Sequence, residues 1–194
     1  MGATYDRILA SESGFARRVA LGVIVKRPVK PLLQLIPGMF IVDFLRRTAA
    51  IRKFSRFYLP PRKAALDAAR QISEGLDREE AMAGAEGAVR AWLDSHGLHG
   101  EEVRRTLIDL VKELVEHDIR LLQAGGATHP DLVRTAYGSR AAYRRFLSRL
   151  AERERAFVGA VADAVGDEEA RRQLEEEQET AEEQRDKESD AVFL

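Results

Sequence analysis

The chain has no cysteine, a single tryptophan and no apolar run long enough to cross a membrane. Without cysteine it can form no disulfide framework, no thiolate zinc site, no cysteine-bound iron–sulfur cluster and no cysteine nucleophile. Its longest apolar stretch, residues 29–45, is interrupted by charged residues, prolines and a glycine. As a helix this stretch would reach about 26 Å, short of a hydrocarbon core of roughly 30 Å. We therefore do not expect a simple transmembrane span.

Motifs that mark catalytic or nucleotide-binding sites are also missing. The sequence has no Gly-x-Ser-x-Gly, no phosphate-binding Gly-Lys-Ser/Thr loop and no Gly-x-Gly-x-x-Gly. Glu113 and His117 are four residues apart and could share a metal on one helical face, but no Glu-x-x-His occurs. His117 falls on an apolar stripe, so we interpret it as a hydrogen-bonded core histidine. The sequence predicts a non-enzymatic protein with no cofactor.

Charge is divided unevenly along the chain, although the chain as a whole carries a net −1. Residues 15–63 hold twelve Lys or Arg and one acid, a net charge of +11. Residues 1–14 carry a net charge of −1, so residues 64–194 must carry a net charge of −11. Within that acidic part, residues 167–190 hold twelve acids and four bases. Such segregation indicates contact with an anionic surface, or pairing of the two parts of the chain with each other.

Helical periodicity runs through most of the sequence, and no segment is typical of a strand. The spacing of apolar residues predicts helices over residues 4–26, 39–58, 61–73, 77–95, 101–124 and 128–166, the last of them either broken or kinked at Gly138-Ser139. Pro60-Pro61 should end the second of these at Tyr58. The helix over 101–124 has the widest apolar stripe and should be central. We predict an all-α fold, a bundle of three or four antiparallel helices with a basic, apolar helical N-terminal arm and an acidic C-terminal tail.

We divide the chain into three parts on this basis. Residues 1–60 form a basic amphipathic helical arm, residues 61–166 the helical bundle, and residues 167–194 an acidic tail that is either helical or disordered. The tail has few apolar residues, so we expect it to dock loosely and to be dispensable for folding.

The arm carries the candidate site. Residues 28–58 combine bases with aromatic side chains, a composition typical of segments that lie in a membrane interface. Each base near an anionic leaflet adds about 1 kcal/mol to binding. The same pattern is expected if the apolar face packs on the bundle and the bases point to water, or if the arm enters a groove of a partner protein. The candidate contact residues are Phe40, Phe44, Arg46, Arg47, Arg52, Lys53, Phe54, Arg56 and Phe57.

Three hypotheses for function follow. The first is a helical interaction protein that is peripheral at an anionic membrane surface through residues 28–58. The second is a soluble structural or adaptor subunit, or a homo-oligomer, with the same arm buried against a protein partner. The third is a metal-binding helical bundle.

Nucleic acid is not favoured as a partner, because no helix-turn-helix or zinc-finger spacing is visible and the bases alternate with aliphatic residues. We expect the protein in the cytoplasm, at the inner face of the cytoplasmic membrane. Asp6 and Glu12 stand where a secretory signal would need positive charge.

Overall fold

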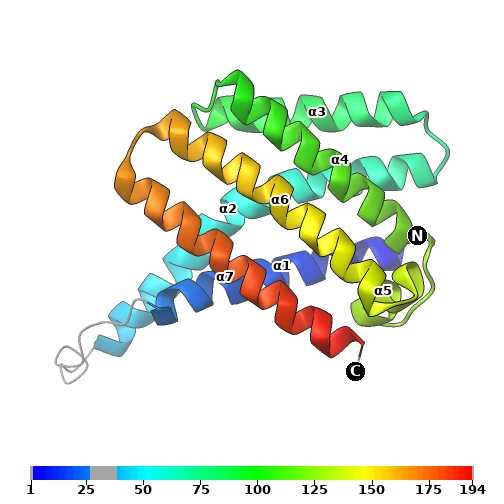
Figure 1. Cartoon of the computed structure of the whole chain (residues 1–194), viewed down its shortest axis with the longest axis horizontal. Helices are drawn as coiled ribbons and strands as arrows, with labels where there is room; N and C mark the ends of the chain where they lie inside the picture. The colour runs from blue at the N-terminus through cyan, green and yellow to red at the C-terminus, as the bar shows by residue number, and fades with distance from the viewer. Residues whose placement is uncertain (1, 27–38, 194) are drawn as a thin grey trace.

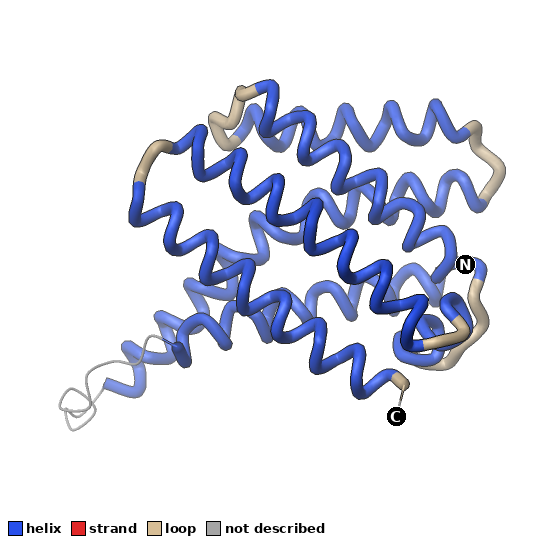
Figure 2. The backbone as a smooth tube through the Cα atoms, viewed as in Figure 1, coloured by secondary structure: helices blue, strands red, loops and turns tan. Residues whose placement is uncertain are grey.

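The computed structural model describes residues 2–26 and 39–193, and the side chains of residues 2–24 and 48–193. This part of the chain is all-helical, as predicted, and contains no strand. Short turns join the helices from α2 onward (Figure 2). The helices are α1 (Gly2–Lys26), α2 (Met39–Ser73), α3 (Arg78–Ser95), α4 (Glu101–Gln123), α5 (His129–Tyr137), α6 (Arg140–Val165) and α7 (Glu168–Val192).

The long helices run back and forth, so that neighbours in the sequence pack side by side (Figure 1). α2 packs against α1, α3 and α4, and α7 packs against α6 and α1. The prediction that residues 101–124 form the central helix is confirmed, since α4 contacts α1, α2, α3, α5 and α6. Its wide apolar stripe supplies much of the core, burying Val103, Leu107, Leu110, Val111, Leu114, Val115, Leu121 and Leu122.

The predicted helix end at Tyr58 is wrong, because α2 continues through Pro60 and Pro61 to Ser73. Proline holds φ near the helical value, but each proline removes its own N–H bond and its ring crowds the carbonyl four residues earlier, so the pair weakens the helix. Pro61 is buried, and its apolar contacts oppose that cost. The predicted domain boundary at residue 60 therefore falls inside a helix, and separate folding of the two sides stays a prediction.

α1 belongs to the packed body of the molecule. Ile8, Phe15 and Val19 on its inner face are all buried. Gly22 lies so close to α7 that an added Cβ would come within 2.8 Å of Thr180 Cγ2. Any larger residue at this position would force the Thr180 side chain or the helix that carries it to shift. The N-terminal part of the predicted arm is thus held between α2 and α7.

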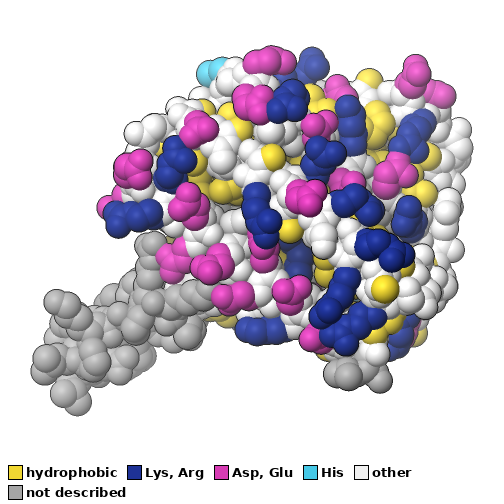
Figure 3. All heavy atoms as spheres, in the orientation of Figure 1, with side chains coloured by type: hydrophobic (Ala, Val, Ile, Leu, Met, Phe, Trp, Pro, Cys, Tyr) yellow, Lys and Arg dark blue, Asp and Glu magenta, His cyan; other side chains and the backbone are white. Residues whose placement is uncertain are grey.

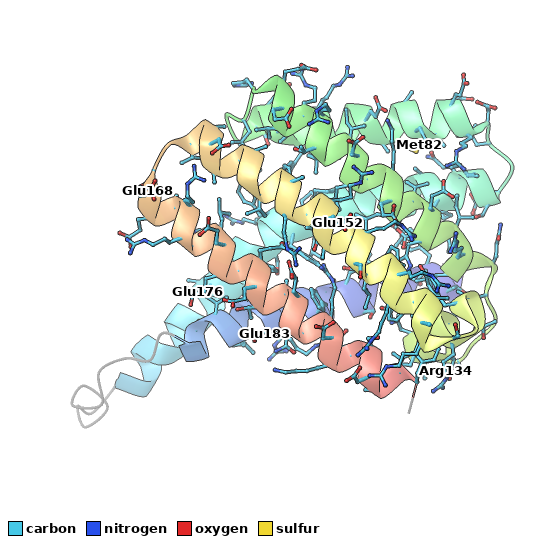
Figure 4. All side chains as sticks on the ribbon, in the orientation of Figure 1. Met82, Arg134, Glu152, Glu168, Glu176 and Glu183 are labelled. Carbon is cyan, nitrogen blue, oxygen red and sulfur yellow. The ribbon has the colours of Figure 1, made fainter. Side chains whose placement is uncertain are left out.

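The acidic C-terminal segment is a helix, one of the two states predicted for it. The expectation of loose docking is wrong, because α7 packs on α1 and α6 through small side chains that let the backbones approach closely. Figure 4 labels Glu176 and Glu183 on α7. The buried residues of α7 are Thr180, Ala181, Arg185, Ser189 and Val192.

Candidate functional site

The nine predicted contact residues lie near the N-terminal end of α2. Four of them are outside the side chains that the structure describes, and their contacts stay predictions: Phe40, Phe44, Arg46 and Arg47. Of the other five, Arg52, Lys53 and Arg56 are exposed, whereas Phe54 and Phe57 are half-buried.

The three exposed bases surround a shallow hollow of about 460 Å³ between α2 and the end of α3. We call it the basic hollow, and the described residues that line it are Ala49, Arg52, Lys53, Arg56, Phe57 and His96. None of these lining residues is a carboxylate. Within the part of the chain whose side chains are described, Arg52 and Arg56 have no ion-pair partner. An anion that approaches the basic hollow therefore meets uncompensated positive charge.

Arginines elsewhere on the surface are mostly paired. On the face drawn in Figure 3, Lys and Arg side chains alternate with Asp and Glu across α6 and α7. The Nε atom of Arg149 lies 3.0 Å from Glu113 Oε1, for example, and the guanidinium of Arg155 binds both oxygens of Glu182. Exposed pairs of this kind contribute little to stability, but they leave little free charge for a ligand. The basic hollow is thus distinguished by bringing two arginines without described ion-pair partners and an exposed lysine together where no described lining residue is a carboxylate.

Aromatic packing supports the floor of the basic hollow. The ring of Phe57 meets Trp92 edge-on, with 5.2 Å between ring centroids, and lies 5.2 Å from the ring of His96. Phe54 instead stacks on Tyr58 at 5.2 Å. Both phenylalanines make intramolecular contacts, so on this part of α2 the bases face solvent and the rings form walls.

A second feature, which the sequence did not predict, is a partly open cavity of about 250 Å³ that is lined by residues of α2, α4, α6 and α7. We call it the apolar cavity. It shares Lys53 and Phe57 with the basic hollow, so the two lie on either side of the same stretch of α2. Its apolar lining residues are Phe54, Phe57, Pro61, Leu110, Phe157, Val158, Val161, Val165, Ala170, Leu174 and Ala181.

The inner wall of the apolar cavity is a buried ionic cluster. The carboxylate of Glu154 accepts hydrogen bonds from Arg62 and from Arg185, whose Nη2 lies 2.6 Å from Oε1. Arg62 Nε lies 3.0 Å from Glu12 Oε2, and the Tyr58 hydroxyl donates to that same oxygen at 2.9 Å. Two carboxylates and two guanidiniums are therefore brought together from four helices.

The electrostatics of the ionic cluster follow from this pairing. Burial opposes ionisation of Glu154, but the charges of Arg185 and Arg62 outweigh it and hold the pKa of the carboxyl below its usual value. Nearby, burial and then the charge of Glu12 raise the pKa of Asp118 well above its usual value. The cluster is balanced as it stands and has no surplus charge to offer a ligand.

The prediction of a core position for His117 is confirmed. The side chain is buried, Nδ1 lies 2.7 Å from the Tyr137 hydroxyl, and the ring stacks on Phe146 with 4.2 Å between centroids. Burial is the main cause that lowers the pKa of His117 to about 3, so the ring is neutral at physiological pH. Among the described residues, no three His, Asp or Glu are placed to hold a metal ion.

The sequence did contain one overlooked signal for the ionic cluster. Glu154 lies on the apolar stripe of α6, in register with Leu150 and Phe157, where a charge must be buried with a partner. Its partners come from α2 and α7, and the sequence offers no sign of which arginines they are.

No helix in the described ranges is both long and apolar enough for a membrane span. Comparison of the chain with protein-family models, curated proteins and solved structures finds no match.

Proposed function

We propose that this protein is a non-enzymatic helical interaction protein that docks on an anionic membrane surface through the basic hollow. The observation that carries the proposal is the uncompensated charge of Arg52 and Arg56, beside the exposed Lys53, where no described lining residue is a carboxylate. The anionic cytoplasmic leaflet has the matching charge, which supports the inner face of the cytoplasmic membrane as the proposed docking surface.

The expected strength of docking is modest. Three bases at about 1 kcal/mol each supply about 3 kcal/mol, on the order of a 100-fold gain over a neutral surface. The net charge of −1 gives the whole molecule no general attraction to an anionic leaflet, so binding depends on the local surface. Insertion of Phe40 and Phe44, which the sequence predicts, would add an apolar contribution.

Vesicle co-sedimentation tests the proposal directly. The full chain is mixed at low salt with vesicles of phosphatidylcholine and phosphatidylglycerol, and separately with vesicles of phosphatidylcholine alone. We expect it to sediment only with the anionic vesicles and to be released as salt is raised, because salt screens exposed charges. A double variant, Arg52→Ala with Arg56→Ala, should bind about 30-fold more weakly, since two bases are lost.

The matched control changes the same number of charges elsewhere. Arg145 and Arg172 are both exposed and lie outside the basic hollow. The double variant Arg145→Ala with Arg172→Ala should keep nearly full vesicle binding. Membrane docking is wrong if the wild-type chain stays in the supernatant with anionic vesicles, and that result would favour an arm that binds a protein partner. Equal losses in the two double variants would refute the assignment to the basic hollow.

A further inference from the structure

The apolar cavity has the size and lining of a binding site for one slender ligand. Its volume of about 250 Å³ exceeds the roughly 150 Å³ of an engineered cavity that binds benzene, but lies below the range of drug-sized pockets. Protein interiors normally leave few voids larger than a water molecule. Here α7 contributes Ala170 and Ala181 where larger side chains would fill the space.

The apolar cavity opens to solvent where its lining residues are exposed. Lys53 is exposed, and Val165, at 48 % exposure, is one of the most exposed large apolar side chains among the described residues. The ammonium of Lys53 donates to Gln173 Oε1 at 3.3 Å, and Gln173 Nε2 donates to Glu177 Oε1 at 3.0 Å. A ligand can therefore enter between α2 and α7, past a polar rim.

The ionic cluster decides which end of a ligand goes inside. Arg62 and Glu154 line the inner wall, but their charges are already matched within the protein. A charged group pushed against that wall would lose its hydration and gain no free partner. The charge of a ligand must stay at the rim, where Lys53 is the base that lines the opening and where the carboxylate of Glu177 already accepts a hydrogen bond from Gln173.

We propose that the apolar cavity binds the chain of a single-chain anionic amphiphile, a fatty acid of medium length, with its carboxylate at Lys53. The chain lies against the valines and phenylalanines of α6 and α2, and the carboxylate takes the lysine ammonium in place of the Gln173 amide oxygen. This inference goes beyond membrane docking, because it requires no vesicle. The cavity lies beside the proposed docking surface, so an amphiphile that leaves an anionic leaflet would reach the cavity directly.

Calorimetric titration of the full chain with decanoate, below its micellar concentration, tests the site. We expect one binding event per chain, and a change in the emission of Trp92, the only tryptophan, because Phe57 both lines the cavity and contacts its ring. Decanol and decylamine serve as neutral and cationic comparisons and should bind more weakly. In the same titration, tighter binding of lysophosphatidylglycerol than of decanoate would indicate a membrane lipid as the natural source of the chain, and tighter binding of decanoate would indicate a free acid.

Substitutions at the wall and at the rim separate the two ends of the ligand. Ala170→Trp should weaken decanoate binding at least about tenfold by filling the cavity, whereas Ala164→Trp, at an exposed position outside the lining, should not. Lys53→Gln should weaken decanoate about two- to fivefold, as expected for an exposed charge pair, and leave decanol unchanged. Val158→Phe provides a second filling variant if Ala170→Trp melts at a lower temperature than the wild type.

The results separate this inference from membrane docking. No decanoate binding by the folded wild-type chain would overturn it, as would binding that survives both filling variants. Decylamine binding as tight as decanoate would overturn the assignment of the charged end to Lys53. Ala170→Trp should still bind anionic vesicles, whereas Arg52→Ala with Arg56→Ala should still bind decanoate. A failure of vesicle binding with decanoate binding intact would therefore refute docking alone.

Discussion

Removing the carboxylate of Glu154 should be among the most destabilising single changes in the protein. Its side chain is 7 % exposed and is shared by two guanidiniums, those of Arg62 and Arg185, which are 7 % and 10 % exposed. In Glu154→Gln both arginines stay buried. Arg185 loses the one ion-pair partner that it has among the described residues, whereas Arg62 retains Glu12. Breaking one member out of a buried ionic group costs about 3–5 kcal/mol. For a chain of this length that lowers Tm by roughly 6–20 °C.

The assay is urea unfolding at pH 7, followed by circular dichroism, with thermal melts in parallel. Neutral pH is required because the pKa of Glu154 lies below its usual value in the folded state. Its contribution to stability is complete above the pKa of an unfolded glutamate, and it is lost as pH falls through the lower folded value. The variant and the wild type should therefore converge in stability at acidic pH.

Two controls test whether the loss in Glu154→Gln comes from buried charge that is left without a partner. Glu188→Gln removes an exposed pair, with 2.6 Å between Arg18 Nη2 and Glu188 Oε1, and should cost less than about 1 kcal/mol. Replacing the whole group with Glu12→Gln, Arg62→Met, Glu154→Leu and Arg185→Met should cost less than Glu154→Gln alone, because all four charges are removed and none is left buried without a partner. A loss below about 1 kcal/mol in Glu154→Gln, or a quadruple variant that is equally unstable, would contradict the burial of a matched ionic cluster.

Three further predictions follow from the packing and the buried titrating groups. Gly22→Ala should destabilise the protein by about 1–3 kcal/mol in urea unfolding, because its Cβ overlaps Thr180; an unchanged midpoint would contradict the α1–α7 approach. Asp118→Asn should raise stability at pH 7. The pKa of Asp118 is higher in the folded chain than in the unfolded chain, so the free energy of unfolding falls as pH rises between these two values. A loss of stability in this variant would contradict the burial that raises the pKa. His117→Gln should reduce the loss of stability between pH 6.5 and 5, because a folded pKa of about 3 means that only the unfolded chain takes up a proton there. An unaltered pH dependence in that variant would show that other groups cause it.

The predicted independence of residues 61–166 can be tested by expressing them alone. The structure leads us to expect a non-cooperative melt, because this piece lacks the buried faces of α1 and α7 and contains Glu154 without Arg185. A cooperative melt close to that of the full chain would instead support the division made from the sequence.

Three features could be predicted from the sequence alone: the all-helical class, the central position of α4 and the burial of His117. Each of these depends on residues a few positions apart on one helix, and a period of 3.6 residues places those residues on a common face wherever the helix lies. The caps of α3, α5 and α6, formed by Asp77, Thr128 and Ser139, are equally local.

The packing of α7, the length of α2, the partners of Glu154 and the apolar cavity could not be predicted from the sequence and are seen in the tertiary structure alone. The composition of α7 is typical of a solvated acidic segment, but its small residues pack on α1. Pro60-Pro61 is typical of a helix end, but α2 continues through both prolines. The partners of Glu154 lie 92 and 31 residues away, and the apolar cavity is lined by four helices whose relative placement no local pattern encodes. Pairing and cavity shape depend on the distances between helices, which are fixed only when all the helices pack together.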